Sequence, residues 1–264
     1  MPNTTLDLNN PDTRQEILLE RLKQGTILVA RDIAQEFAVS ADTIRRDLIA
    51  LENKGLLKRV KGGAMPLNSP VQPPTIPMAQ RLREQSDWLK SGVTKNPEIF
   101  SDLISDTSTL FLDGGTSVLF FARQLPHRFT GLVITPSPLV AAVALEKEIE
   151  TVLIGGKIRP LGGIATGAET VRGLLECTAN LVVLGACGID PRFGLSADDL
   201  EEAAVKQAMA KQADKVVVLA GKDKVNTRSR HKVLPCSDID ILITSAPRQE
   251  TAIYDLSEIE VRHV

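Results

Sequence analysis

Short runs of aliphatic residues recur along the second two-thirds of the chain, and each is about as long as one buried strand. The runs are Leu110–Asp113, Leu132–Thr135, Thr151–Ile154, Leu181–Leu184, Val216–Ala220 and Ile239–Thr244. Stretches with helical character separate most of them, including Val118–Leu125, Pro138–Leu145 and Asp198–Asp214. Because apolar strands that alternate with helices must be covered on both faces, the pattern predicts an α/β fold with a mostly parallel sheet.

Composition agrees with such a fold and excludes several other classes of protein. Aromatic residues make up only 3% of the 264 residues, so the core must consist mainly of Leu, Val, Ile and Ala. A hydrophobic content of 43% and a charged content of 24% exclude wholesale disorder, collagen and low-complexity sequence. The length allows one large domain or two ordinary ones.

Signals for membranes, secretion and metals are weak throughout the sequence. No apolar run approaches the ~20 residues that a membrane helix needs, and Met1–Asn10 is polar without a cleavable apolar segment. Cys177, Cys187 and Cys236 are far apart, and none of the three histidines falls in a zinc-binding spacing. We therefore expect a cytoplasmic protein with no membrane partner, no metal and no cofactor, whose cysteines act as small apolar residues.

The first 64 residues have the element pattern of a winged helix-turn-helix. The spacing of apolar residues predicts helices at Thr13–Gln24, Val29–Phe37 and Ser40–Lys54, then a strand at Leu56–Val60 and a hairpin tip at Lys61–Gly63. Ser40 is a good N-cap for the third helix because its hydroxyl can accept a free backbone N–H. In such a motif the third helix enters the major groove of DNA.

The strongest basic cluster of the chain lies in this head. The whole chain has a net charge of −2, but Thr43–Gly63 contains six basic and two acidic residues. The apolar stripe of the third helix faces inward, which leaves Thr43, Arg45 and Arg46 where they could contact base edges. Three basic residues of the hairpin would contact phosphates, namely Lys58, Arg59 and Lys61. The alternative is a small helical bundle with a solvated basic face.

Five prolines between Pro66 and Pro77 mark a domain boundary, because this composition favours extended, semi-rigid chain. We therefore divide the chain into a head at residues 1–64, a linker with a connecting helix at 65–90 and an α/β domain at 91–264. The connecting helix is expected at Met78–Lys90, where it could join the two domains or lie along a partner subunit.

The first expected strand of the α/β domain ends in a candidate anion site. It is followed by the residues Asp113, Gly114, Gly115, Thr116 and Ser117, and a helix begins there. Glycines let a ligand approach the backbone, and the free N–H groups of a helix N-terminus favour an anion such as phosphate. The alternative is an ordinary strand–helix turn capped by Thr116 or Ser117.

Three later segments add weaker candidates for the same site. Gly156 and Lys157 follow another expected strand, where the lysine would add a cation. Asp199 could accept hydrogen bonds from sugar hydroxyls, but Ser196-x-x-Asp199 also approximates a capping box that needs no ligand. Lys224 could pair with a phosphate or remain solvated.

Several motifs of the head resemble the signature of DeoR-type transcriptional regulators. They are Asp32-Ile33-Ala34, Val39-Ser40-x-x-Thr43-Ile44-Arg45-Arg46-Asp47-Leu48, Gly55-Leu56-Leu57-x-Arg59 and Lys61-Gly62-Gly63-Ala64, which resembles the family's H-G-G-A with Lys in place of His. The resemblance implies that Ser40, Thr43, Arg45 and Arg46 contact operator DNA. Asp47 could instead pair with a neighbouring arginine and orient it.

Motifs of the α/β domain resemble the family's effector domain, which is similar to ribose-phosphate isomerases and CoA-transferases and binds phosphorylated sugars. The matching motifs include Asp113-x-Gly115-Thr116-Ser117, Gly188-Ile189-Asp190, Gly194-Leu195 and Asp199-x-x-Glu202-Ala203. The effector-binding residues that we expect are Asp113, Gly114, Gly115, Thr116, Ser117, Gly156, Lys157, Asp199, Glu202 and Lys224. The chain departs from the family pattern at Pro136, where Asn is usual, and at Gly221, where Asp is common.

The resemblance implies a regulator of carbohydrate-metabolism genes, most often a repressor, and not an enzyme. Its expected partners are double-stranded operator DNA and a phosphorylated sugar that changes DNA affinity. A dimer or tetramer is expected as well, since a single winged module has a small DNA interface. The alternative is a sugar-phosphate isomerase-like enzyme with a DNA-binding head, in which Asp113, Asp199 and Glu202 would be the acid–base carboxylates.

Overall fold

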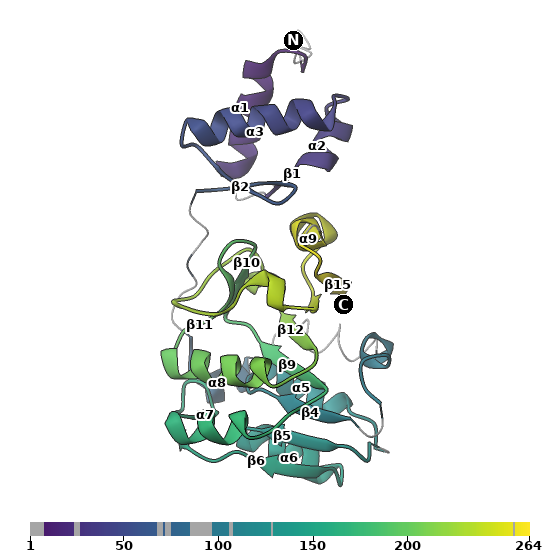
Figure 1. Ribbon diagram of the computed structural model, residues 1–264, viewed down its shortest axis with the longest axis vertical. Coiled ribbons are helices and arrows are strands. Elements are labelled where there is room, and N and C mark those ends of the chain that lie inside the picture. The colour runs from purple at the N-terminus through teal and green to yellow at the C-terminus, as the bar shows by residue number, and fades with distance from the viewer. Residues whose placement is uncertain are drawn as a thin grey trace.

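Two domains lie end to end in the computed structural model, a small head with the N-terminus and a larger α/β domain with the C-terminus (Figure 1). The residues that it describes are 8–23, 27–67, 71, 75–84, 97–105, 108–127, 129–255 and 257–264. None of the described helices is long and apolar enough to cross a membrane.

The head is the winged helix-turn-helix that the sequence predicts. Its elements are α1 (Pro11–Lys23), β1 (Leu28–Val29), α2 (Ala30–Glu36), α3 (Ala41–Asn53), β2 (Lys58–Val60) and β3 (Gly63–Met65). The strands form one antiparallel sheet in the order β1-β3-β2, so the hairpin β2–β3, called the wing below, is anchored on β1. Leu18 of α1, Ile44 and Leu51 of α3, and Leu57 before the wing share one small core.

The larger domain is built on a seven-stranded parallel sheet, as the aliphatic runs predict. Its spatial order is β15 (Glu260–His263), β14 (Ile241–Thr244), β12 (Val216–Ala220), β9 (Leu181–Gly185), β4 (Thr109–Leu112), β5 (Leu132–Thr135) and β6 (Glu150–Leu153). Every neighbouring pair is parallel. The edge strand β15 had no counterpart in the sequence-based prediction.

Helices cover both faces of this sheet. They are α5 (Thr116–Gln124), α6 (Pro138–Glu146), α7 (Ala168–Leu175) and α8 (Leu200–Lys211). Successive residues of a strand point to opposite faces, so Leu110 and Leu112 pack against α5 and α6, whereas Phe111 and Val182 pack on the side of α7 and α8. The expected two-sided burial is therefore confirmed.

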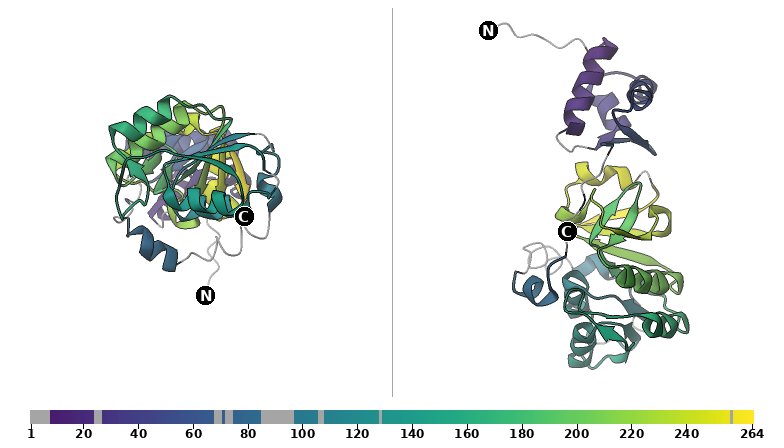
Figure 2. Two further views of the ribbon diagram at one scale, coloured as in Figure 1. Left: turned by 90° about the horizontal axis from the view of Figure 1, so that it is seen from below. Right: turned by 90° about the vertical axis from the view of Figure 1, so that its left-hand side faces the viewer.

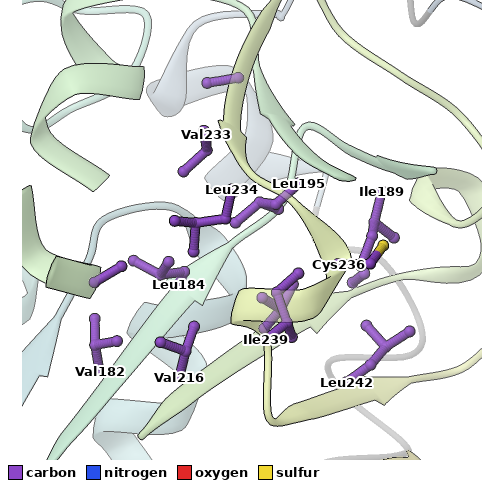
Figure 3. Close-up of a cluster of buried hydrophobic side chains, with 14 of the residues drawn as sticks. Val182, Leu184, Ile189, Leu195, Val216, Val233, Leu234, Cys236, Ile239 and Leu242 are labelled. Carbon is purple, nitrogen blue, oxygen red and sulfur yellow. The ribbon is translucent and has the colours of Figure 1, made fainter. Parts of the chain in front are cut away.

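A second, antiparallel sheet packs on the α8 side of the domain and was not foreseen. Its strands are β10 (Gly188–Asp190), β11 (Gly194–Ala197) and β13 (His231–Leu234). Figure 3 shows Ile189 and Leu195 of this sheet in one apolar cluster with Leu184 of β9 and Val216 of β12. The remaining short elements are β7 (Lys157–Ile158), β8 (Ala165–Thr166) and the 3-10 helices Pro97–Phe100, Lys222–Lys224 (η3) and Cys236–Asp238.

The wing contacts the C-terminal part of the larger domain at α9 (Arg248–Asp255). Met65 of β3 belongs to the same apolar cluster as Ile253 of α9, and an ideal β-carbon on Gly63 would lie 3.3 Å from Ile253 Cδ1. The Lys61 ammonium donates to Glu258 Oε1 at 2.7 Å. Figure 2 shows the head standing on the yellow C-terminal segments of the larger domain.

The connecting helix α4 (Met78–Arg83) packs on the larger domain of its own chain. The Met78 amide donates to the Pro160 carbonyl at 3.0 Å, and the buried Met78 side chain reaches Gly163. The C-terminal part of the expected helix, residues 85–90, lies outside the described residues. The described part of this helix therefore contacts the larger domain, and a contact with a partner subunit stays a prediction.

Candidate functional site

The N-terminal half of α3 presents polar and basic side chains to solvent. Ser40 caps the helix by accepting the Thr43 amide at 3.0 Å, as predicted, and the two hydroxyls are 2.8 Å apart. Arg45 and Arg46 are exposed, and the Arg46 guanidinium lies 2.7 Å from the Asp42 carboxylate. An exposed ion pair of this kind is weak, so it does not prevent Arg46 from contacting another anion.

Asp47 supports α3 from inside the head. Its carboxylate accepts from Arg14 Nε of α1 at 2.7 Å, and both side chains are about 5% exposed. Arg14 also donates to the carbonyls of Leu8 and Asn9. Asp47 thus pairs with an arginine from another helix, so its role is to hold α1 against α3 rather than to orient Arg45 or Arg46.

The three basic residues of the wing have different surroundings. Lys58 is exposed, whereas the Arg59 guanidinium lies 3.4 Å from the Glu52 carboxylate of α3. Lys61 at the tip of the wing pairs with Glu258 of the larger domain. DNA contacts by these residues stay a prediction, and for Lys61 they would compete with the contact between the two domains.

A cavity of about 400 Å³ lies beyond the carboxyl ends of β4, β9 and β12. This is the position at which parallel α/β sheets bind ligands. The cavity brings together seven of the expected effector residues, namely Asp113, Gly114, Gly115, Thr116, Ser117, Glu202 and Lys224. Its volume falls within the range of small-molecule sites.

Asp113 and Lys206 form a buried ion pair in the floor of this cavity. The Asp113 side chain is 1% exposed and that of Lys206 is 6% exposed. Asp113 Oδ2 accepts from the Lys206 ammonium and from the Gly185 amide, and Lys206 also donates to the Gly185 carbonyl at 2.9 Å. Burial alone would lower the pKa of Lys206, but the Asp113 carboxylate and other nearby anionic groups outweigh it and raise that pKa.

The turn between β4 and α5 is shaped for close approach of a ligand. Gly115 has a φ of +90°, which L side chains rarely adopt. An ideal β-carbon on Gly114 would lie 2.0 Å from Ile164 Cγ2, so this position requires glycine as well. The N-cap of α5 is Gly115, and no side chain caps the helix. The alternative of a turn capped by Thr116 or Ser117 is therefore wrong. The first N–H groups of such a helix need other partners.

Glu202 of α8 also lines the cavity and lies against the backbone of Gly162. Burial raises the pKa of the Glu202 carboxyl above its ordinary value; the positive charges of Lys206 and Arg81 oppose this, whereas Asp113 adds to it. A raised carboxyl pKa means that ionised Glu202 costs stability in the folded protein.

Replacing Glu202 with glutamine is expected to raise the melting temperature near neutral pH. A raised pKa penalises folding only where the carboxyl is ionised, so the gain should shrink as the pH falls towards 4.5, the ordinary pKa. Thermal melts of both proteins over a pH series measure this difference. The exposed Glu146→Gln is the control and should show no such trend; a gain for Glu202→Gln that is constant with pH would contradict the interpretation.

Three expected effector residues do not line the cavity. Gly156 and Lys157 follow β6, the edge strand, and Gly156 instead lets Thr170 of α7 approach closely. Asp199 is the N-cap of α8, where it accepts from two backbone amides, and it pairs with Arg159 at 2.8 Å. Ser196 lies in β11 rather than at the helix start, so the cap is Asp199 itself.

Several cavity residues were missed at the level of the sequence. The most informative are Arg81, Lys206, Thr75 and Cys187. Lys206 lies one helical turn after Glu202 on α8, and that spacing was the available signal. Among the described residues there is no group of histidine, cysteine and acidic side chains that could hold a metal ion.

Comparisons with known proteins match both domains separately. A family model described as the DeoR-like helix-turn-helix domain matches residues 14–69. A second model, described as the DeoR C terminal sensor domain, matches residues 98–246. The first match covers most of the winged helix-turn-helix, and the second covers most of the parallel sheet and most of the residues that line the cavity.

Individual relatives are similar to this chain over both domains together. The HTH-type transcriptional repressor GlcR of Bacillus subtilis (strain 168) is 30% identical over 237 residues, which cover 88% of each chain. The glycerol-3-phosphate regulon repressor of Escherichia coli (strain K12) is 26% identical over 250 residues, or 94% of this chain and 96% of that protein. The solved ribose 5-phosphate isomerase A of Methanocaldococcus jannaschii aligns with a TM-score of 0.38 at 19% identity, over 52% of this chain and 54% of that one.

Proposed function

The chain belongs to the DeoR family of transcriptional regulators, and from this premise we propose that it represses genes of carbohydrate metabolism. In this proposal the head binds a specific operator in double-stranded DNA, and a phosphorylated sugar in the larger domain changes the affinity of the head for that operator. The proposal is supported most strongly by one observation, the exposed N-terminal half of α3 with Thr43, Arg45 and Arg46.

The head would read DNA through α3 and hold it through the wing. Arg45 and Arg46 are long donors that can reach base edges in the major groove, while Ser40 and Thr43 lie at the helix start. Lys58 would contact phosphates beside the groove, together with Arg59 and Lys61. Since these contacts are largely ionic, the affinity should fall steeply as salt rises.

The cavity of the larger domain would bind the effector. The N-terminus of α5 and the hydroxyls of Thr116 and Ser117 offer donors to a phosphate, and Lys224 adds a cation at the rim. Asp113 and Glu202 offer acceptors for sugar hydroxyls. One relative is named as the repressor of a glycerol-3-phosphate regulon, which supports a small phosphorylated metabolite.

We further propose that the cavity binds its ligand without converting it. The two sequence relatives described above are named as repressors. Of the three candidate acid–base carboxylates, Asp113 is paired with Lys206 and Asp199 does not line the cavity, and no histidine is among the described residues that line it. Incubation of the protein with a panel of pentose and hexose phosphates should leave all of them unchanged; turnover of any one would favour the isomerase-like alternative.

A cytoplasmic location and a dimer or tetramer complete the proposal. One winged module buries little surface on DNA, so two heads on a repeated operator would be needed for useful affinity. Light scattering of the full chain, alone and with operator DNA, measures the number of copies. A particle with the mass of one chain in both states would contradict this part of the proposal.

The function is tested by selecting DNA from a random duplex pool with the full-length protein. We expect one enriched sequence with two related half-sites, bound more tightly than random DNA. Mobility shifts with that sequence then follow release by inorganic phosphate, glycerol 3-phosphate, hexose 6-phosphates and the unphosphorylated sugars. Failure to enrich any sequence would contradict the proposal of a sequence-specific regulator. If none of the phosphates releases the DNA, the proposed class of effector is contradicted.

A further inference from the structure

The segment between the two domains supplies part of the effector cavity. The residues that line the cavity include two from the linker, Thr75 and Ile76, and two at the connecting helix, Arg81 and Glu84. These residues follow the wing in the sequence, and α4 begins only 13 residues after the end of β3 at Met65. A ligand in the cavity would therefore touch both the sensor domain and the chain that leads to the head.

The linker is attached to the larger domain by a few polar contacts. The Thr75 amide donates to Asp198 Oδ2 at 2.8 Å, and the Leu67 carbonyl accepts from Arg192 at 3.3 Å. Val71 forms an isolated parallel bridge with Arg228, three residues before β13. Only a short stretch of linker thus separates the wing from the cavity wall, and it follows the domain surface at each of these points.

Arg81 is the cation that the linker brings to the cavity. Its Nε donates to the Ile76 carbonyl at 3.1 Å and its Nη2 to the Leu161 carbonyl at 2.7 Å, so the guanidinium is held in place. An ideal β-carbon on Gly115 would lie 3.9 Å from Arg81 Nη1. The third nitrogen of the guanidinium therefore lies beside the first turn of α5, where the helix N-terminus favours an anion.

A second observation in the same cavity points to a ligand with a hydrogen-bond donor. Asp113 Oδ1 is buried and has no hydrogen-bond partner, although the other oxygen of this carboxylate is fully engaged by Lys206 and Gly185. A buried charged oxygen without a partner is costly, and such atoms are rare in folded proteins. A ligand hydroxyl that donates to Asp113 Oδ1 would remove this cost.

We propose that the Arg81 guanidinium binds the anionic group of the effector against the N-terminus of α5, so that the ligand joins the sensor domain to the linker and acts on the head through it. This inference rests on the proposed function and goes further, because it assigns the ligand's anionic group to a residue outside the sensor domain and names the linker as the coupled element. A ligand shifts DNA affinity only if it binds the two states differently. A contact with the linker allows the ligand to bind the two states with different affinity, because the linker sets where the head can lie.

The test compares full-length Arg81→Gln with Arg83→Gln, an exposed arginine of the same helix that does not line the cavity. Titration calorimetry with inorganic phosphate and with the sugar phosphates of the release assay measures affinity. Arg81→Gln is expected to weaken binding about 10- to 100-fold, the usual loss for a charge-assisted hydrogen bond. Arg83→Gln should bind both the ligands and the operator like the wild type, and Arg81→Lys should recover part of the affinity that Arg81→Gln loses.

Hydrogen exchange of the Thr75–Glu84 segment provides the second measurement. We expect the ligand to slow exchange there in the wild type and in Arg83→Gln, but not in Arg81→Gln at the same ligand concentration. Equal affinity of Arg81→Gln and the wild type would overturn the role of Arg81 and leave the proposed function intact. Binding that depends on Arg81 without slower exchange in the segment would overturn the coupling. If the wild type binds its DNA but none of the phosphates, the effector class itself is wrong and the inference falls with it.

Discussion

Replacing Asp113 with alanine is expected to lower the free energy of unfolding of the larger domain by about 3–5 kcal/mol, because it leaves the Lys206 ammonium buried without its partner. For a domain of this size, such a loss corresponds to a melting temperature lower by roughly 6–20 °C. Thermal and denaturant unfolding of the full-length protein measure it. Asp113→Ala is therefore unsuitable as a variant that removes the effector response alone.

A double variant separates the ion pair from other effects of the substitution. Asp113→Ala combined with Lys206→Met removes both charges and keeps an apolar side chain in the space of the lysine. Replacement of both members of a buried pair is often neutral or stabilising, so this protein should regain most of the stability that Asp113→Ala loses. If the double variant is as unstable as the single one, the buried lysine is not the cause.

Replacing Arg45 with alanine is expected to reduce the preference for the operator over random DNA by about 1–3 kcal/mol, or roughly 5- to 150-fold, and Arg46→Ala should do the same. Both side chains are exposed on α3, so neither change should destabilise the head. Binding to the selected operator and to a random duplex of equal length, each over a salt series, measures the preference. Random-sequence affinity should change much less.

Lys58→Ala is the matched control for these two variants. Lys58 is an exposed cation of the wing and is expected to contact phosphate only. Its loss should weaken binding to both duplexes about equally and reduce the salt dependence by about one ion. Arg45 and Arg46 variants that behave like Lys58→Ala would show that these arginines contact phosphates, and α3 would then not be the element that reads the sequence.

The sequence predicts most of the parallel sheet because its strands are nearly pure aliphatic runs. Val216–Ala220 and Leu132–Thr135 are found with the predicted bounds. The antiparallel sheet was missed for the opposite reason: β10 and β11 contain glycine, aspartate and serine, and they are too short for a clear period of two. Such strands depend on burial against β9 and β12, which is decided only by the assembled core.

The candidate site was predicted where the chemistry is local and missed where it depends on packing. The residues after β4 form one continuous segment, so their grouping in the cavity follows from a single strand–helix turn. Lys206 looks like a solvated helical lysine until α8 packs on the sheet, and Arg81 comes from the linker. Gly156 and Lys157 lie outside the cavity because β6 lies at the edge of the sheet, two strands away from β4.

The ion pair between Lys61 and Glu258 joins a basic residue of the wing, which is expected to contact DNA, to the larger domain. The Glu258 carboxylate holds the ammonium at the tip of the wing, and this contact keeps the pKa of Glu258 below its ordinary value. Both side chains are exposed, so the pair is weak, and a DNA phosphate that binds Lys61 in place of Glu258 breaks it at small cost. Binding of Lys61 to DNA and the contact between the two domains are therefore coupled. DNA that binds Lys61 weakens the domain contact, and the domain contact weakens DNA binding by the same free energy.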